Sequence, residues 1–111
     1  MGIPEKKLKN GFKLPVFGFG AFGIGGALKR GPDNDDGKDI SVIKKVLNSG
    51  ITHIDTAEMY AQGYSEILIG RAIKGYDRSK LVIATKVSPM NLNYDGVINA
   101  ANGRRKWLAP S

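Results

Sequence analysis

Three side chains that could carry out acid–base chemistry stand at or just after the ends of two predicted strands. Asp55 ends the segment 51–55, Tyr60 follows in the next loop, and Lys86 lies near the end of the apolar segment 81–87. A lysine in a largely apolar strand needs a partner, which Asp55 on a neighbouring strand could provide. Two interpretations stay open: a structural ion pair beside an unrelated surface tyrosine, or a catalytic group.

The strands that would carry these residues follow a predicted hairpin. Asn10-Gly11 supplies the positive φ angles of a tight turn within residues 6–15. Residues 16–20 then predict a compact strand, whose glycines let a ligand or another backbone come close. Further strands are expected at 51–55, which is β-branched, and at 81–87, which is apolar enough to be covered on both faces.

Helices are predicted between these strands by the helical spacing of apolar residues. The first is expected to open at Asp39 and to end before Gly50. The second is expected to take Ser65 as its N-cap and to end at Gly75, and a third to start at Tyr94. The residues expected on the buried faces are Ile40, Ile43, Val46 and Leu47, then Leu68, Ile69, Ala72 and Ile73. This alternation predicts a parallel sheet with right-handed crossovers, either doubly wound or closed into a barrel.

A glycine motif at residues 18–23 has the G-x-G-x-x-G spacing of dinucleotide-binding loops. That fingerprint requires a helix to begin at once, so that its N-terminus faces the pyrophosphate. Here a long loop follows until about Asp39, and Asp55 comes later than the roughly twenty residues that the fingerprint expects. We therefore predict a flexible turn at a strand end.

The sequence offers no convincing metal site. The acidic run that starts at Asp33 has its glycine fifth and Lys44 twelfth, whereas an EF-hand needs glycine sixth and glutamate twelfth. These acids are expected ahead of a helix N-terminus, where the helix dipole favours negative charge. His53 is expected to be a core histidine. Because it is the only histidine and cysteine is absent, clusters of several histidines and thiolate sites are impossible.

Composition indicates one soluble globular domain: 111 residues, 41% hydrophobic and 24% charged, with a net charge of +7. No apolar run is long enough to span a bilayer or to form a secretory signal, so a cytoplasmic location is expected. The excess charge is expected to solvate the hairpin, although attraction of a phosphorylated cofactor is a second use. A nucleic-acid site would need a basic stripe interleaved with aromatic residues, and no such stripe is found in the sequence. The basic clusters are Lys6, Lys7, Lys9 and Lys13, then Arg104-Arg105-Lys106.

The run from Gly50 to Tyr60, GITHIDTAEMY, resembles the signature of the aldo-keto reductase family. Residues 10–15 and 17–20 resemble the opening hairpin and first strand of that family, and the resemblance spans about residues 6–100. The remaining matching positions are Gly63, Ser65-Glu66, Leu68-Ile69-Gly70, Ala72-Ile73 and Thr85-Lys86.

The resemblance implies an α/β fold, the N-terminal portion of a (β/α)8 TIM barrel. About three βα units would follow a β-hairpin that closes the bottom of the barrel. Residues 1–103 would be a partial NADP-dependent oxidoreductase domain, and residues 104–111 a divergent tail. Members of the family typically use NADPH to reduce aldehydes and ketones to alcohols by direct hydride transfer. The expected partner is therefore a small carbonyl substrate, with no nucleic acid and no membrane.

The resemblance also implies roles for individual residues. Tyr60 would donate a proton to the carbonyl oxygen as general acid. The charge of Lys86 would make this phenol a stronger acid, and Asp55 would hold Lys86 in place. The residues expected near the cofactor are Gly20, Ala21, Phe22 and Asp55. The family often has threonine in the place of Ala21, so a possible hydroxyl contact is missing.

The chain also departs from the family pattern. A catalytic histidine after the fourth strand and the phosphate-binding residues late in the barrel have no counterpart here. Three strands of eight would leave unpaired edges, so little or no turnover is expected from this chain alone. Residues after Gly103 no longer follow the pattern, and our hypothesis is a frameshift or premature stop there, with a genuine short product that has an unfamiliar tail as the alternative. The alternative function is a cofactor-binding regulatory or scaffold subunit, as some relatives serve a channel.

Overall fold

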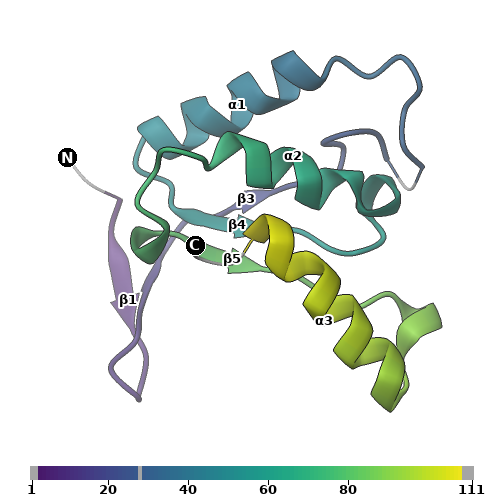
Figure 1. Ribbon diagram of the computed structural model, residues 1–111. Coiled ribbons are helices and arrows are strands. Elements are labelled where there is room, and N and C mark those ends of the chain that lie inside the picture. The colour runs from purple at the N-terminus through teal and green to yellow at the C-terminus, as the bar shows by residue number, and fades with distance from the viewer. Residues whose placement is uncertain (1–2, 28, 109–111) are drawn as a thin grey trace.

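The computed structural model describes residues 3–27 and 29–108, and its chain begins with a two-stranded antiparallel hairpin (Figure 1). Strand β1 (Glu5–Lys7) pairs with β2 (Lys13–Pro15). Gly11 has a φ of 89°, and the Asn10 side chain accepts a hydrogen bond from the Phe12 N–H at 3.0 Å. A turn therefore lies at Asn10-Gly11 as predicted, but only Gly11 has the positive φ expected of both residues.

A three-stranded parallel sheet follows, in the order β3-β4-β5. These strands are Phe19–Gly20, His53–Asp55 and Val82–Ala84, each shorter than the sequence predicted. Phe19, Ile54 and Ile83 lie side by side across the sheet, and so do Gly20, Asp55 and Ala84 one residue later. Because side chains alternate between faces, the first row points toward the helices and the second toward the opposite face.

Three α-helices connect and cover these strands, α1 (Asp36–Asn48), α2 (Tyr64–Ala72) and α3 (Tyr94–Leu108). Short 3-10 turns precede α2, β5 and α3, namely η1 (Tyr60–Gly63), η2 (Arg78–Lys80) and η3 (Pro89–Asn91). Helices α1 and α2 lie together on one face of the sheet, and α3 lies beside α2 (Figure 1). Within the described ranges, no helix is long and apolar enough to cross a membrane.

Two helix starts differ from the sequence prediction. Helix α1 begins at Asp36 and not at Asp39, because the Asp35 side chain caps it by accepting from the Lys38 N–H at 3.0 Å. Of the acidic run expected ahead of the helix, Asp33 and the N-cap Asp35 do precede it, whereas Asp36 is its first residue. Ser65 is not the N-cap of α2; that position belongs to Gly63, with a φ of 91°.

The Ser65 prediction was wrong because α2 already begins at Tyr64, so Ser65 is its second residue and cannot be the N-cap. Ser65 is fully buried inside the first turn of α2. Its hydroxyl lies 3.3 Å from that of Thr56 and 3.5 Å from the Ala21 carbonyl oxygen to which it donates. The side chain thus joins α2 to the ends of β3 and β4.

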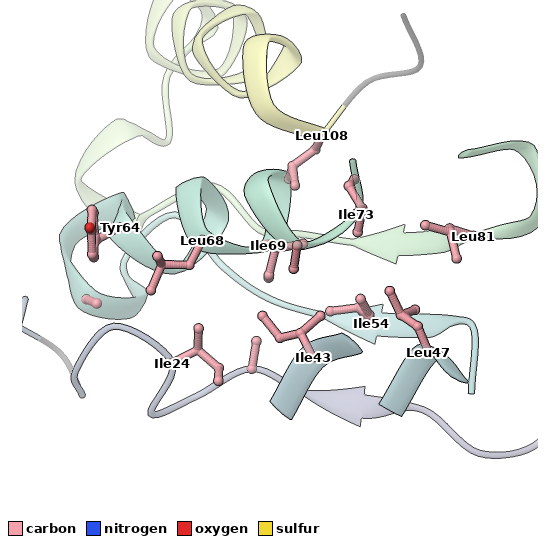
Figure 2. Packing of buried hydrophobic residues seen from close by; sticks show 13 residues of the cluster. Ile24, Ile43, Leu47, Ile54, Tyr64, Leu68, Ile69, Ile73, Leu81 and Leu108 are labelled. Atoms are coloured by element: carbon pink, nitrogen blue, oxygen red, sulfur yellow. The ribbon is translucent and has the colours of Figure 1, made fainter. Parts of the chain in front are cut away.

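The hydrophobic core lies between the sheet and helices α1 and α2. Figure 2 shows Ile43 and Leu47 of α1, Ile54 of β4 and the α2 side chains Leu68 and Ile69 converging on it. Ile40 packs against this core, and the predicted buried residues Ala72 and Ile73 belong to it. The end of α3 contributes Leu108, whose carbonyl oxygen accepts a hydrogen bond from Arg78 Nε at 2.6 Å. Helix α3 therefore continues past Gly103.

Truncation of Ile43 tests this core against a neighbouring position on the same helix. Ile43→Ala removes a fully buried side chain and should lower the free energy of unfolding by about 2–5 kcal/mol. Val42→Ala, at a side chain that is 38% exposed, should change it by about 0.5 kcal/mol or less. Urea unfolding followed by circular dichroism measures both, and equal effects would contradict this assignment of the buried face.

Candidate active site

Asp55 and Lys86 meet where β4 and β5 end. Lys86 Nζ lies 2.8 Å from Asp55 Oδ1 and donates a second hydrogen bond, also 2.8 Å, to the Thr56 carbonyl oxygen. Parallel pairing continues beyond the strands, because Thr56 N–H donates to Ala84 O at 2.8 Å and Glu58 N–H to Lys86 O at 2.9 Å. The backbone register thus places the lysine beside its carboxylate, and the ion pair predicted from the sequence is present.

Tyr60 lies next to this ion pair, so the tyrosine is not an unrelated surface residue. Lys86 Nζ is 5.4 Å from the centroid of the Tyr60 ring, within the range of a cation–π contact. On another side, the Phe22 ring meets the Tyr60 ring edge to face, with centroids 5.3 Å apart and planes at 76°. The half-buried phenol ring therefore has a cation and an aromatic edge as neighbours.

The ion pair favours the charged form of Lys86. The hydrogen bond to the Asp55 carboxylate raises the pKa of the Lys86 ammonium above its usual 10.5, and this effect outweighs the desolvation that lowers it. Attraction to Asp55 and to Tyr60 acts in the same direction. The two side chains are 52% and 55% exposed, so solvent screens much of this interaction. Lys86 is a cation at neutral pH.

Three of the residues predicted near the cofactor, Gly20, Ala21 and Phe22, lie at the end of β3 and in the loop that follows it. Gly20 and Phe22 lie beside Asp55 and Tyr60. Gly20 pairs with Asp55 in the sheet, and a Cβ built on it would meet no atom within 4 Å, so open space lies above it. Phe22 is 58% exposed beside Tyr60. Ala21 differs: its side chain is fully buried in the core, and its N–H donates to the Asp55 carbonyl oxygen at 2.9 Å.

Glu58 holds together two loops of the site, a role that was not predicted from the sequence. Its carboxylate accepts hydrogen bonds from the Ser88 N–H at 2.6 Å and from Asn91 Nδ2 at 2.7 Å. It therefore ties the loop after β4, which leads to Tyr60, to the loop after β5. An acid three residues beyond a strand end was the available signal, but hydrophobic periodicity does not show which backbone N–H it would meet.

His53 lies in β4 and is only partly buried, with its ring against Gly18. A Cβ on Gly18 would lie 3.0 Å from His53 Nδ1, so a larger residue there would press on the imidazole. The ring thus packs against Gly18, but a partly buried residue outside the hydrophobic core is not the core histidine that the sequence predicted.

Comparison with known proteins gives a consistent result. The sequence profile described as "Aldo/keto reductase family" matches residues 16–110. The "Probable aldo-keto reductase 1" of Glycine max is 42% identical over 83 residues, which are 75% of this chain and 23% of that protein. The "Putative voltage-gated potassium channel subunit beta" of Schizosaccharomyces pombe is 44% identical over 70 residues, which are 60% of this chain and 20% of that protein.

Solved structures agree in fold. The thermostable aldo-keto reductase Tm1743, in complex with the inhibitor epalrestat, superposes with a TM-score of 0.89 at 36% identity. The superposed region covers 96% of this chain and 39% of the Tm1743 chain. An aldo/keto reductase from Klebsiella pneumoniae, in complex with NADP and acetate, superposes with a TM-score of 0.74 at 27% identity. That superposed region covers 89% of this chain and 33% of the reductase chain.

These matches also choose between the two parallel-sheet architectures, because aldo-keto reductases are TIM barrels. The chain spans about a quarter of the length of the curated relatives that it matches. Its hairpin, three parallel strands and covering helices correspond to part of that barrel. By sequence and by fold, the chain belongs to the aldo/keto reductase family.

Proposed function

We propose that a complete barrel containing this segment is an NADPH-dependent reductase that converts aldehydes or ketones to alcohols. The observation that carries this proposal is the contact of Lys86 with both Asp55 and Tyr60 at the carboxyl ends of the strands. Chemistry in parallel α/β barrels takes place at that end. A structural ion pair alone would not require a phenol beside the lysine.

In this mechanism Tyr60 acts as the general acid. Negative charge develops on the carbonyl oxygen of the substrate as the carbonyl carbon is reduced, and the Tyr60 hydroxyl donates its proton to that oxygen. The O–H bond of the phenol breaks, the O–H bond of the alcohol forms, and the charge left on Tyr60 is stabilised by the Lys86 ammonium. Asp55 holds this ammonium in place through the 2.8 Å hydrogen bond.

The residues at the end of β3 fit a planar cofactor ring. The open space above Gly20 lies beside the Asp55 carboxylate, which can accept hydrogen bonds from a ligand. When bound, NADPH would supply the hydride. Phe22 would cover the site next to Tyr60, whereas Ala21 would contribute only by holding the backbone, since its side chain is buried. NADP and NADPH are bound in homologous structures.

A second function, a cofactor-binding subunit without turnover, is favoured by one observation. A relative 44% identical over the aligned region carries the name of a potassium channel subunit. The same Tyr60, Lys86 and Asp55 would then serve to bind NADPH and a partner, and not to transfer a proton. Catalytic turnover separates the two functions.

Replacing Tyr60 by phenylalanine tests the general acid. Tyr60→Phe keeps the ring that contacts Phe22 and Lys86 but removes the proton, so kcat should fall by about 10²–10⁴-fold. The affinity for NADPH should stay within about twofold, because the ring is retained. The measurement is the oxidation of NADPH by a simple aromatic aldehyde, followed by the absorbance of NADPH near its maximum at about 340 nm. The protein measured carries this segment within a full barrel.

Tyr76→Phe is a matched control, since that hydroxyl bonds to Asn48 at 2.9 Å on the outer face and should leave kcat unchanged. Turnover retained in Tyr60→Phe would exclude Tyr60 as the general acid. A folded wild-type protein that binds NADPH but reduces no carbonyl compound would favour the subunit function instead.

Replacing Asp55 by asparagine tests the effect of this carboxylate on the titration of Lys86. Asp55→Asn removes the carboxylate that raises the Lys86 pKa, so this pKa should fall toward 10.5 or below. The pKa of Lys86 is higher in the folded protein than in the unfolded chain. The ion pair therefore stabilises the fold fully at pH values below the unfolded-state pKa, and this stabilisation is lost as the pH rises through the folded-state pKa. Heteronuclear NMR of the lysine side chains between about pH 8 and 12 follows the titration. With Asp95→Asn as control, an unchanged Lys86 curve in Asp55→Asn would contradict the pairing.

A further inference from the structure

The turn that follows Tyr60 has an unusual backbone. Ala61 (φ 49°, ψ 35°) and Gln62 (φ 58°, ψ 37°) are both left-handed, and neither is glycine. L-residues other than glycine rarely adopt this conformation, because Cβ crowds the following carbonyl oxygen. Two such residues in succession persist only where surrounding contacts fix them, and such strain is concentrated at functional sites.

The contacts that fix this turn come from the long loop between β3 and α1. The Ala61 N–H donates to the Ala27 carbonyl oxygen at 2.7 Å. The Gln62 side chain reaches the same loop, where its Oε1 accepts from the Arg30 N–H at 3.1 Å. Two successive residues of the turn are thus bound to one segment that is more than thirty residues away in sequence.

The loop is itself anchored, so it can hold the turn. Its Gly25 N–H donates to Asp39 Oδ2 at 2.8 Å, and the Asn34 side chain donates to the same oxygen at 2.9 Å, so the loop is tied to α1. Arg30 lies over the Tyr64 ring at 3.6 Å, which ties the loop to α2.

Gly25 also shows how closely the loop lies on the turn. A Cβ there would come within 3.1 Å of the Tyr64 ring and 3.3 Å of the Ala61 Cβ, at a φ of 82° that side chains rarely adopt. Only a glycine allows this approach without displacing Ala61. The fit between loop and turn is therefore part of the packing.

We infer that Gln62 is a positioning residue for Tyr60: its bond to the β3–α1 loop holds the left-handed turn and so fixes the phenol against Lys86 and Phe22. Phe22 lies near the start of the same loop, so one segment both holds the turn after Tyr60 and contacts the Tyr60 ring. Loosening the turn would let the phenol leave the orientation needed for proton transfer while the cofactor surface at Gly20 stays in place. This inference rests on the proposed reductase function.

Two variants of Gln62 separate positioning from folding. Gln62→Gly removes the acceptor but suits the left-handed backbone, so the fold should survive while kcat falls about tenfold and the KM for NADPH stays within about twofold. Gln62→Glu retains an acceptor for the Arg30 N–H and should keep kcat within about twofold of wild type. The control is Lys29→Ala, which changes the same loop. Among the described contacts, the Lys29 side chain makes no hydrogen bond.

Hydrogen exchange of the Ala61 amide gives a second readout that does not need turnover. If Gln62 holds the turn, this amide should exchange at least about fivefold faster in Gln62→Gly than in wild type, and not in Lys29→Ala. Unchanged kcat in Gln62→Gly, or an equal loss in Gln62→Glu, would overturn the inference while leaving the reductase function intact. If wild type shows no turnover, the reductase function fails, and unchanged Ala61 exchange would then overturn the holding role of Gln62 separately.

Discussion

The parallel register of β4 and β5 is the constraint on which the site depends. It sets Asp55 opposite Ala84, and the pairing continues for two more residues, so Lys86 emerges beside the carboxylate. A slip of one residue would turn every side chain of the strand to the other face, placing Lys86 toward the apolar core and Ile83 toward solvent. The burial of Ile54 in the core therefore helps to fix the register and, with it, the position of the Lys86 charge.

Polar contacts between loops then refine what the register establishes. Glu58 ties together the segments after β4 and β5, and Ser65 lies between the ends of β3 and β4. The bonds of Glu58 to Ser88 and of Ser65 to Ala21 thus join different βα units of the site. A buried or half-buried polar group that lost such a partner would be costly, which makes these contacts specific as well as stabilising.

Long periodic elements and a glycine turn could be predicted from the sequence, whereas the left-handed turn after Tyr60 could not. On α1, apolar spacing correctly predicts Ile40, Ile43 and Leu47 at the core, whereas Val46 is only partly buried and lies outside it. The turn at Gly11 follows from glycine. The ion pair of Asp55 and Lys86 followed from the need of a strand lysine for a partner. Ser65 misled because a serine before an apolar run suits an N-cap, whereas the left-handed Ala61 and Gln62 carry no residue preference that would reveal them.

Solvent access determines how strongly the site can act. Gly20, Asp55 and Ala84 form a row on the face opposite the helices, and all three are exposed in the described part of the chain. Water there screens the charge of Lys86, whose effect on a nearby phenol is much greater at low dielectric constant. The geometry of Tyr60, Lys86 and Asp55 is therefore set within this segment, whereas its chemical strength depends on what covers that face. A surface that excludes water would strengthen proton donation by Tyr60 without moving any of the three residues.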